Sequence, residues 1–344
     1  MGRALESDFF MTKMTIFQRL HRWTPLAVIG CAAGWSLGVQ AQDLVLYTSQ
    51  PNTDAQSTVD AFNQVHPDIQ VSWVRDGTTQ LMTRLEAEVQ AGVSKPDVLL
   101  IADSVTMASL KARGWLQPYL SPLRTPYDAA LYDPQGYYYG TKMITTGIAY
   151  NTRAAAQPQS WKDLTQAVYQ GQVTMPSPLY SGAALIHLAA ITEDPGLGWA
   201  YYEQLQRNGA TAQGGNGAVM AAVASGTKPY GVLVDYMAIR EKAKGAPIEF
   251  VFPAEGVSVV TEPVAILQSA KNTEAARKFV DFVLSQTGQE LVRQQGYIPA
   301  LPTLPMPAGF PSRADIKPLP LNPEQALAQG AQDKARFANL FDAR

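Results

Sequence analysis

Residues 96–101 read Pro-Asp-Val-Leu-Leu-Ile, and this apolar run ends at Ala102-Asp103-Ser104. A short strand that is apolar on both faces is typical of the middle of a parallel sheet, because helices cover each side of such a sheet. Open α/β folds bind their ligands at the carboxyl ends of these strands. The run therefore predicts an α/β fold and places Asp103 at the ligand-binding edge of the sheet.

Predicted strands and helices alternate on both sides of this run. Short polar links join them, which is the signature of α/β layering. The spacing predicts strands at 44–47, 69–74, 138–151 and 263–266, and helices at 54–65, 78–91, 273–295 and from 323 onward.

The first 41 residues predict an export signal. Basic residues at 19–22 precede an apolar run over 23–39, and Val39-Gln40-Ala41 has the small-x-small pattern that a signal peptidase cuts. We expect cleavage after Ala41 and a periplasmic protein. Two alternatives stay open: lipidation at Cys31, in a segment that loosely resembles a lipobox, and a retained membrane anchor.

The remaining composition excludes several function classes. Cys31 is the only cysteine, so loss of the leader leaves no disulfide and no thiolate chemistry. The leader holds four of the 27 basic and two of the 29 acidic residues, which leaves 23 basic and 27 acidic ones. This weak acidity argues against nucleic acid as a partner. Beyond residue 41 neither Gly-x-Ser-x-Gly nor a Walker-type loop occurs, so we expect neither an enzyme nor a cofactor.

Five segments carry a family resemblance, and they lie in order along the chain. They are Leu46-Tyr47-Thr48-Ser49; residues 136–140 with 149–152; residues 161–164; residues 173–178 with Ser181-Gly182-Ala183-Ala184; and residues 275–280 with 288–289 and 297–299. Together they resemble the solute-binding proteins of bacterial ABC importers, in the class that takes ferric iron, phosphonates and sugar phosphates.

The resemblance implies a type II periplasmic-binding-protein fold, with the ligand in a cleft between two lobes joined by hinge strands. Lobe one would comprise residues 42–146 plus 260–344, and lobe two residues 147–259. It also implies a monomer that delivers a small anionic solute to an ABC permease in the inner membrane. A periplasmic sensor that docks on a receptor kinase is an alternative.

Candidate anion-binding residues stand where helices are expected to begin. Ser181-Gly182-Ala183 runs into a helix, whose start offers unpaired N–H groups and the positive end of the dipole. The resemblance implies that this segment holds an anion, and that Asn216 contacts one as well. Thr78 adds a hydroxyl donor at a third helix start, and Ser49 follows the first strand. A plain Ser N-cap without a ligand is the alternative for Ser181.

Candidate partners for a cationic group are the carboxylates Asp103, Asp235 and Glu262. Facing the anion site, they would suit a zwitterion such as an aminoalkylphosphonate. In the alternative, Asp103, Asp235 and Tyr236 supply oxygen ligands to ferric iron. The resemblance implies a His and a tyrosine pair for iron, but Gln50-Pro51 and Asp235-Tyr236 stand at those places.

Overall fold

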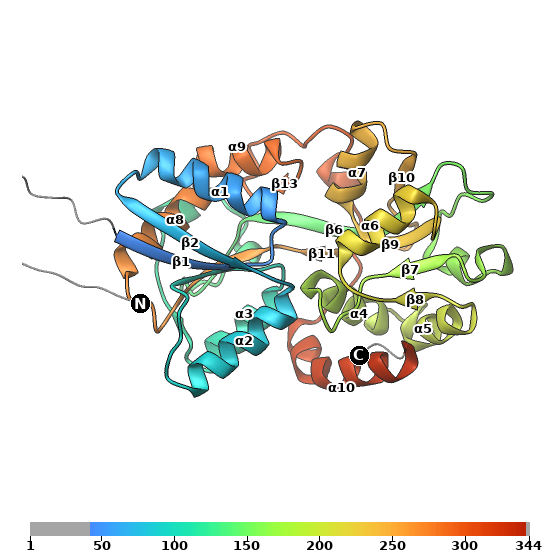
Figure 1. Cartoon of the computed structure of the whole chain (residues 1–344), viewed down its shortest axis with the longest axis horizontal. Helices are drawn as coiled ribbons and strands as arrows, with labels where there is room; N and C mark the ends of the chain where they lie inside the picture. Colours follow the sequence, from blue (N-terminus) through green and yellow to red (C-terminus); the bar gives the residue numbers. More distant parts are fainter. Residues whose placement is uncertain (1–41, 342–344) are drawn as a thin grey trace, which may run out of the picture. The chain divides into compact units, whose positions relative to one another are not determined.

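The computed structural model describes residues 42–341; the predicted leader, with Cys31, lies outside that range. Within it, six strands form a first sheet in the order β2-β1-β3-β12-β4, with β5 paired to β12. Figure 1 shows β1 and β2 of this sheet side by side. β1 runs parallel to β2 and β3, whereas β12 runs antiparallel to β3. The bounds are β1 Gln42–Thr48, β2 Ile69–Arg75, β3 Val98–Leu100, β4 Leu116–Gln117, β5 Tyr139–Gly140 and β12 Pro263–Leu267.

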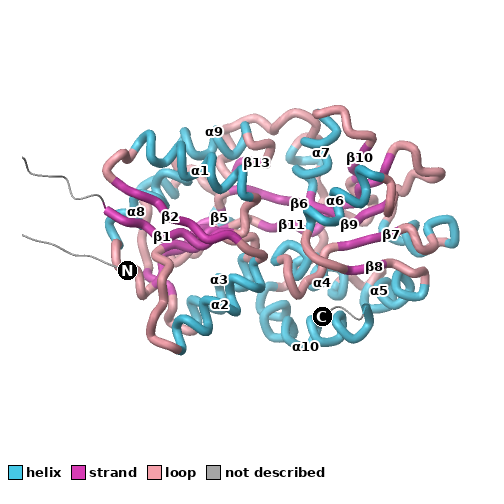
Figure 2. Tube along the Cα trace, viewed as in Figure 1, coloured by secondary structure: helices cyan, strands magenta, loops and turns pink. Residues whose placement is uncertain are grey.

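The apolar run at 98–101 has helices on both of its faces. Val98 and Leu100 pack into a core with α1 and α8, while Leu99 and Ile101 pack into a core with α2 and α3. Figure 2 shows α1 on one side of these strands and α2 with α3 on the other. The prediction of a covered central strand is therefore confirmed, although antiparallel β12 makes the sheet mixed. These helices are α1 Asn52–Val65, α2 Thr78–Gln90, α3 Ser104–Ala112 and α8 Thr273–Leu284.

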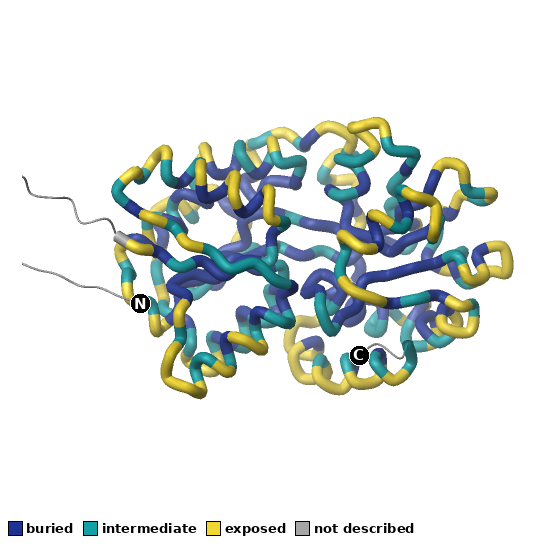
Figure 3. The backbone as a smooth tube through the Cα atoms, in the orientation of Figure 1, coloured by how far each residue is buried: buried dark blue, intermediate teal, exposed yellow. Residues whose placement is uncertain are grey.

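A second sheet has its own core. Its strands follow the order β10-β6-β9-β7-β8, and both β11 and β13 pair with β6. Trp161 and Tyr202 are among the largest buried side chains, and Figure 3 shows buried strands beneath more exposed helices and turns. The bounds are β6 Lys142–Asn151, β7 Val173–Met175, β8 Thr211–Ala212, β9 Tyr230–Val234, β10 Ile248–Val251, β11 Ser258–Val260, β13 Ile298–Pro299, α4 Gly182–Glu193, α5 Gly198–Arg207, α6 Asn216–Ser225 and α7 Asp235–Ala243.

The chain crosses between the sheets where one long strand was predicted at 138–151. β5 pairs with β12 of the first sheet, whereas β6 pairs with β9 of the second. At Thr141, between the two strands, the N–H donates to the carbonyl of Thr261 at 3.1 Å. The return crossing passes through Glu262, between β11 and β12. These crossings are the hinge candidates of the structure.

The helix predicted at 273–295 is two helices, α8 and α9 (Gln286–Gln294). Ser285 is extended, and its hydroxyl accepts the N–H of Gly288 at 3.1 Å. A Cβ at Gly288 would lie 2.1 Å from the carbonyl oxygen of Phe282. The prediction of one helix was wrong because apolar spacing continues across the break, whereas the break depends on a serine cap and on space at one glycine.

The final helix, α10 (Pro323–Phe341), was predicted and is present. The carboxamide of Asn322 accepts the N–H of Glu324 at 3.0 Å, and Phe337 is buried with its ring centroid 5.6 Å from that of Tyr202. The division into lobes stays a prediction. We propose one change to it: α10 belongs with the second sheet, because it packs on α4 and α5 as well as on α3.

No helix within residues 42–341 is long and apolar enough to span a membrane.

His187, inside α4, is expected to make stability depend on pH. Its ring lies 4.7 Å from that of Trp161, and burial lowers the pKa of the imidazole to about 3. Because the unfolded chain binds this proton near pH 6.5, stability is present above that pH and is lost as pH falls toward 3. From pH 7 to pH 5 the loss is about 2 kcal/mol.

The measurement compares urea unfolding of the wild type and the His187→Gln variant at both pH values. The free-energy difference between the two proteins should shift by about 2 kcal/mol in favour of the variant at pH 5. A difference that stays constant with pH would mean that His187 is charged in the folded protein.

Candidate functional site

A cleft of about 340 Å³ opens where α2, α4 and α6 begin. Its walls come from both sheets and from the crossing segments between them. Eight of the ten predicted site residues line it: Ser49, Thr78, Ser181, Gly182, Ala183, Asn216, Tyr236 and Glu262. The structure does not bring Asp103 and Asp235 to this cleft.

The hydroxyl group of Ser181 donates no hydrogen bond to any of residues 42–341. Its oxygen accepts the N–H of Ala184 at 3.3 Å and the amide Nδ2 of Asn216 at 3.2 Å. A hydroxyl has two acceptor sites and one donor. Both acceptor sites are filled, so the proton remains for an acceptor outside the described residues. Asn216 is itself held in place, because its Oδ1 accepts the N–H of Val234 at 3.2 Å.

The start of α4 contributes backbone donors beside this hydroxyl. The N–H groups of Gly182 and Ala183 have no acceptor among residues 42–341. Gly182 also lies close to the first sheet: a Cβ there would lie 2.6 Å from the carbonyl oxygen of Ala102 and 2.8 Å from Thr78 Oγ1. Glycine is required here for space.

Hydroxyl groups from the first sheet face the start of α4. Thr78 is 2% exposed, and its Oγ1 has no hydrogen-bond partner in the described part of the chain. Ser49 accepts the N–H of Ala102 at 2.9 Å, which leaves its proton available. Thr78 begins α2, so three helix N-termini meet at one cleft.

Arg75 also lines the cleft, and the sequence analysis missed it. It is the last residue of β2, opposite Thr48 at the end of parallel β1. A signal was available, since a charged residue at the carboxyl end of a parallel strand lies at the edge where ligands bind. The predicted strand ended one residue too early.

Glu262 lines the cleft, and its carboxylate forms an ion pair with Lys142. Its carboxylate lies 2.5 Å from the ammonium of Lys142 and accepts Gln50 Nε2 at 3.2 Å. The two charged side chains are 2% and 1% exposed. Burial raises the pKa of Glu262, while Lys142 and Gln50 act against that rise. Its φ of 36° is left-handed, a conformation that is strained for a non-glycine residue.

Tyr236 lines the cleft near the crossing segments. Its ring centroid lies 4.2 Å from that of Tyr297, and the guanidinium of Arg240 lies 4.6 Å from each ring. Burial raises the pKa of the Tyr236 phenol well above its usual value. The group therefore faces the cleft as a neutral hydroxyl.

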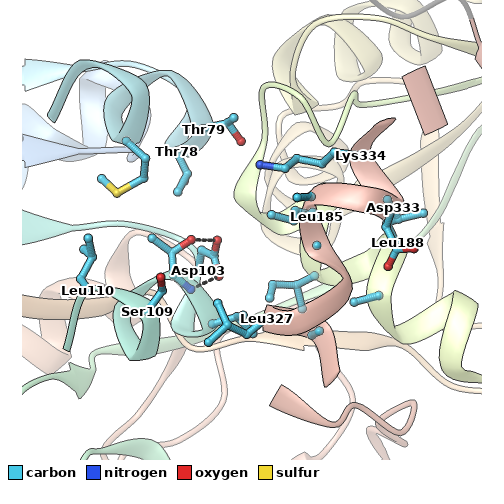
Figure 4. Close-up of a pocket in the computed structure, with 18 of the residues that line it drawn as sticks. Thr78, Thr79, Asp103, Ser109, Leu110, Leu185, Leu188, Leu327, Asp333 and Lys334 are labelled. Carbon is cyan, nitrogen blue, oxygen red and sulfur yellow. Dashed lines mark hydrogen bonds between the residues drawn. The ribbon is translucent and has the colours of Figure 1, made fainter. Parts of the chain in front are cut away.

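Asp103 lies on the wall of a second cavity of about 230 Å³, formed by α2, α3, α4 and α10 (Figure 4). It caps α3: one oxygen accepts the N–H of Thr106 at 2.9 Å, and the other accepts the Thr106 hydroxyl. Burial raises the pKa of this carboxyl, and the hydrogen bonds from Thr106 act against the rise. Asp103 lies at the edge of the sheet, as predicted, but its carboxylate caps the N-terminus of α3.

Asp235 is turned into the protein. Its carboxylate accepts the N–H of Thr145 at 2.9 Å, the Thr145 hydroxyl at 2.7 Å and the N–H of Tyr236 at 2.6 Å. Burial raises the pKa of Asp235 to about 7, although these hydrogen bonds oppose the rise. All of its partners belong to the second sheet and α7.

The alternative iron ligands are therefore not grouped. Tyr236 lines the cleft, Asp103 lines the second cavity, and Asp235 lines neither. Across residues 42–341, no three His, Cys, Asp or Glu side chains lie close enough together to hold a metal ion.

Comparisons with known proteins agree on one class. Residues 94–322 match the sequence profile of a family described as bacterial extracellular solute-binding protein. An uncharacterised protein of Haemophilus influenzae is 30% identical over 79% of this chain and 81% of its own length. Iron uptake protein A1 of Synechocystis is 26% identical over 81% of each chain.

Solved structures share the fold. The periplasmic binding protein AfuA of Actinobacillus pleuropneumoniae, solved with bound fructose 6-phosphate, superimposes with a TM-score of 0.80. The match is 24% identical and covers 88% of this chain and 99% of AfuA.

Proposed function

The chain belongs to the bacterial extracellular solute-binding proteins and has their type II periplasmic-binding-protein fold, and from this we propose that it captures a small anionic solute carrying a phosphate or phosphonate group. Proteins of this family bind small ligands for ABC importers and are not enzymes. The solute would be held in the cleft at the starts of α2, α4 and α6 and passed to an inner-membrane permease.

The observation that carries this proposal is the unused donor set around Ser181. Its hydroxyl proton, the N–H groups of Gly182 and Ala183 and the hydroxyl of Thr78 all lack acceptors within the described residues. Thr78 Oγ1 is buried, and a buried donor without an acceptor costs free energy. The remaining donors stand beside it at the start of α4, so one ligand group could accept from several of them. A tetrahedral oxyanion offers several acceptor oxygens at once, and helix N-termini stabilise its charge.

The charges of the cleft favour an anion over the predicted zwitterion. Of the three carboxylates proposed to meet an ammonium, only Glu262 lines the cleft, and Lys142 already neutralises it. An ammonium group would find no free carboxylate there. A phosphorylated or phosphonate compound without a cationic group therefore suits the cleft better than an aminoalkylphosphonate.

Relatives support two candidate ligands. AfuA was solved with a sugar phosphate, which favours the anion proposal. Iron uptake protein A1 and the Fe(3+)-binding periplasmic protein of Serratia marcescens, each 26% identical to this chain, favour ferric iron as the second candidate. Of the predicted iron ligands Asp103, Asp235 and Tyr236, only Tyr236 lines the cleft.

Thermal melting of refolded, ligand-free protein separates these candidates. The probes are inorganic phosphate, methylphosphonate, 2-aminoethylphosphonate, fructose 6-phosphate, spermidine and ferric citrate. A ligand at about 100 times its dissociation constant adds about 2.7 kcal/mol, and each kcal/mol raises Tm by roughly 2–4 °C. We expect shifts with phosphate esters or methylphosphonate. A shift with ferric citrate alone would replace the anion proposal by iron binding.

Ser181→Ala is expected to weaken binding of the phosphoryl probe about tenfold, because a charged hydrogen bond contributes about 1.5 kcal/mol or more. The variant also loses the N-cap of α4, at about 1 kcal/mol of folding stability. The measurements are calorimetric titration for affinity and urea unfolding for stability.

Ser285→Ala is the matched control, since Ser285 caps α9 through the N–H of Gly288 and does not line the cleft. It should lose similar stability and keep its affinity. Equal affinities for both variants would show that Ser181 is only a cap.

A further inference from the structure

Arg75 gives the cleft a positive charge. Among the described residues that line the cleft, it alone carries a basic side chain. Within residues 42–341, no carboxylate lies within 4.0 Å of its guanidinium. The charge of Glu262, by contrast, is neutralised by Lys142. The lining therefore has one uncompensated charge, and it is positive.

Two hydrogen bonds fix the guanidinium. Its Nε donates to the carbonyl of Gln50 at 2.9 Å, and Nη1 donates to the hydroxyl of Tyr180 at 3.1 Å. A guanidinium has five N–H donors in a planar fork, so three remain for a ligand. This planar fork can donate to two oxygens of the same phosphate group at once. A lysine ammonium has no such planar pair of donors.

The ring of Tyr180 packs between Gly77 and Gly215, which lie on opposite sides of the cleft. A Cβ at Gly77 would lie 2.9 Å from Cδ1 of the tyrosine ring, and one at Gly215 would lie 2.8 Å from Cε1. Gly77 precedes α2 and Gly215 precedes α6. The ring thus packs between two helix starts from different sheets, and its hydroxyl orients Arg75.

We propose that Arg75 sets the specificity of the cleft for a doubly charged phosphoryl group, and that Tyr180 positions it. This inference rests on the proposed function and limits the ligand to compounds with a dianionic phosphoryl group. Each helix N-terminus acts as roughly half a positive charge, so α2, α4 and α6 together with Arg75 offer somewhat more than two. A ligand group with two negative charges balances this positive charge, whereas a group with one negative charge leaves part of it unbalanced. A cationic group on the ligand would be repelled.

The test compares fructose 6-phosphate, a dianion at pH 8, with fructose 6-sulfate, a monoanion of the same sugar. Affinities are measured by calorimetric titration on refolded protein. The wild type should prefer the phosphate ester by at least about tenfold. Arg75→Met should weaken its binding about 30-fold and remove most of the preference. Arg75→Lys, which keeps the charge and loses the fork, should retain the preference at lower affinity.

Two further variants separate charge from structure. Tyr180→Phe keeps the ring and loses the hydroxyl, so it should lower affinity severalfold and preserve the preference for the dianion. Arg293→Met removes a half-buried arginine that pairs with Glu290 and does not line the cleft, and it should match the wild type in both respects.

The outcomes distinguish the inference from the function on which it rests. Loss of the dianion preference in Arg75→Met, with an unchanged Tm of the ligand-free protein, supports the inference. An Arg75→Met protein that still prefers the phosphate ester overturns the role of Arg75 and leaves the proposed function standing. A wild type that binds neither sugar ester nor inorganic phosphate overturns both.

Discussion

Lys142→Met is expected to lower the free energy of unfolding by about 3–5 kcal/mol near pH 8, because it leaves a buried carboxylate without its counter-charge. Lys142 and Glu262 are almost completely buried and 2.5 Å apart, and the ammonium lies 4.0 Å from the centroid of the Tyr297 ring. The pair stands at the crossings between the sheets. Its loss should therefore destabilise the whole protein rather than one surface.

The pH dependence of this variant follows from Glu262. Without Lys142, burial would raise the pKa of Glu262 further above its unfolded value. The folded variant then binds a proton that the unfolded chain releases, so its stability falls as pH rises. The deficit relative to the wild type should be largest at pH 8 and smaller at pH 5. Urea unfolding at both pH values measures it.

Two variants control this experiment. Lys242→Met breaks an exposed ion pair with Glu249 and should cost less than about 1 kcal/mol. The double variant Lys142→Met, Glu262→Gln removes both charges and should recover most of the loss. If the double variant is as unstable as Lys142→Met, the loss comes from packing and not from the unpaired charge.

Gly182→Ala is expected to weaken ligand binding about 100-fold. The added Cβ would lie 2.6 Å from a backbone oxygen, that of Ala102, which cannot turn aside as a side chain can. The two sheets must then separate at the proposed anion site, and overpacking of this kind costs up to about 3 kcal/mol. Titration with fructose 6-phosphate or inorganic phosphate measures the loss.

The same variant should also be less stable without ligand, because the close approach of position 182 to the Ala102 carbonyl is part of the described structure. The Tm of the ligand-free protein should fall, and the ligand-induced shift should be lost. Gly330→Ala is the control, because a Cβ at this position in α10 meets nothing within 4 Å. An unchanged affinity in Gly182→Ala would mean that the ligand does not need this close approach.

Local chemistry made most of the cleft predictable. Ser181, Thr78 and Asn216 stand at or beside helix starts, and a helix start exposes its N–H groups whatever surrounds it. The three helix starts were therefore found one by one from the sequence. Gly182 was found for its place at a helix start, but the reason it must be glycine lies in Ala102, a residue 80 positions away.

The sequence predicted the positions of the carboxylates less well, because the direction in which a carboxylate points depends on partners far away in the chain. Asp103 follows a strand, as predicted, and Asp235 follows one as well, yet one caps α3 and the other accepts three hydrogen bonds from β6 and α7. A buried charge turns toward whichever donors lower its desolvation cost, and the sequence does not say where those donors lie.

The sequence by itself determined the α/β alternation, the two-face burial of the central strand and the helix starts that can hold an anion, because these follow from periodicity and backbone geometry over a few residues. Only the tertiary structure decided which charges the ligand meets. It neutralised Glu262 with Lys142, turned Asp235 away and brought Arg75 to Tyr180, 105 positions along the chain. Side-chain charges act through space, so their pairing depends on how the sheets pack and not on their order in the sequence.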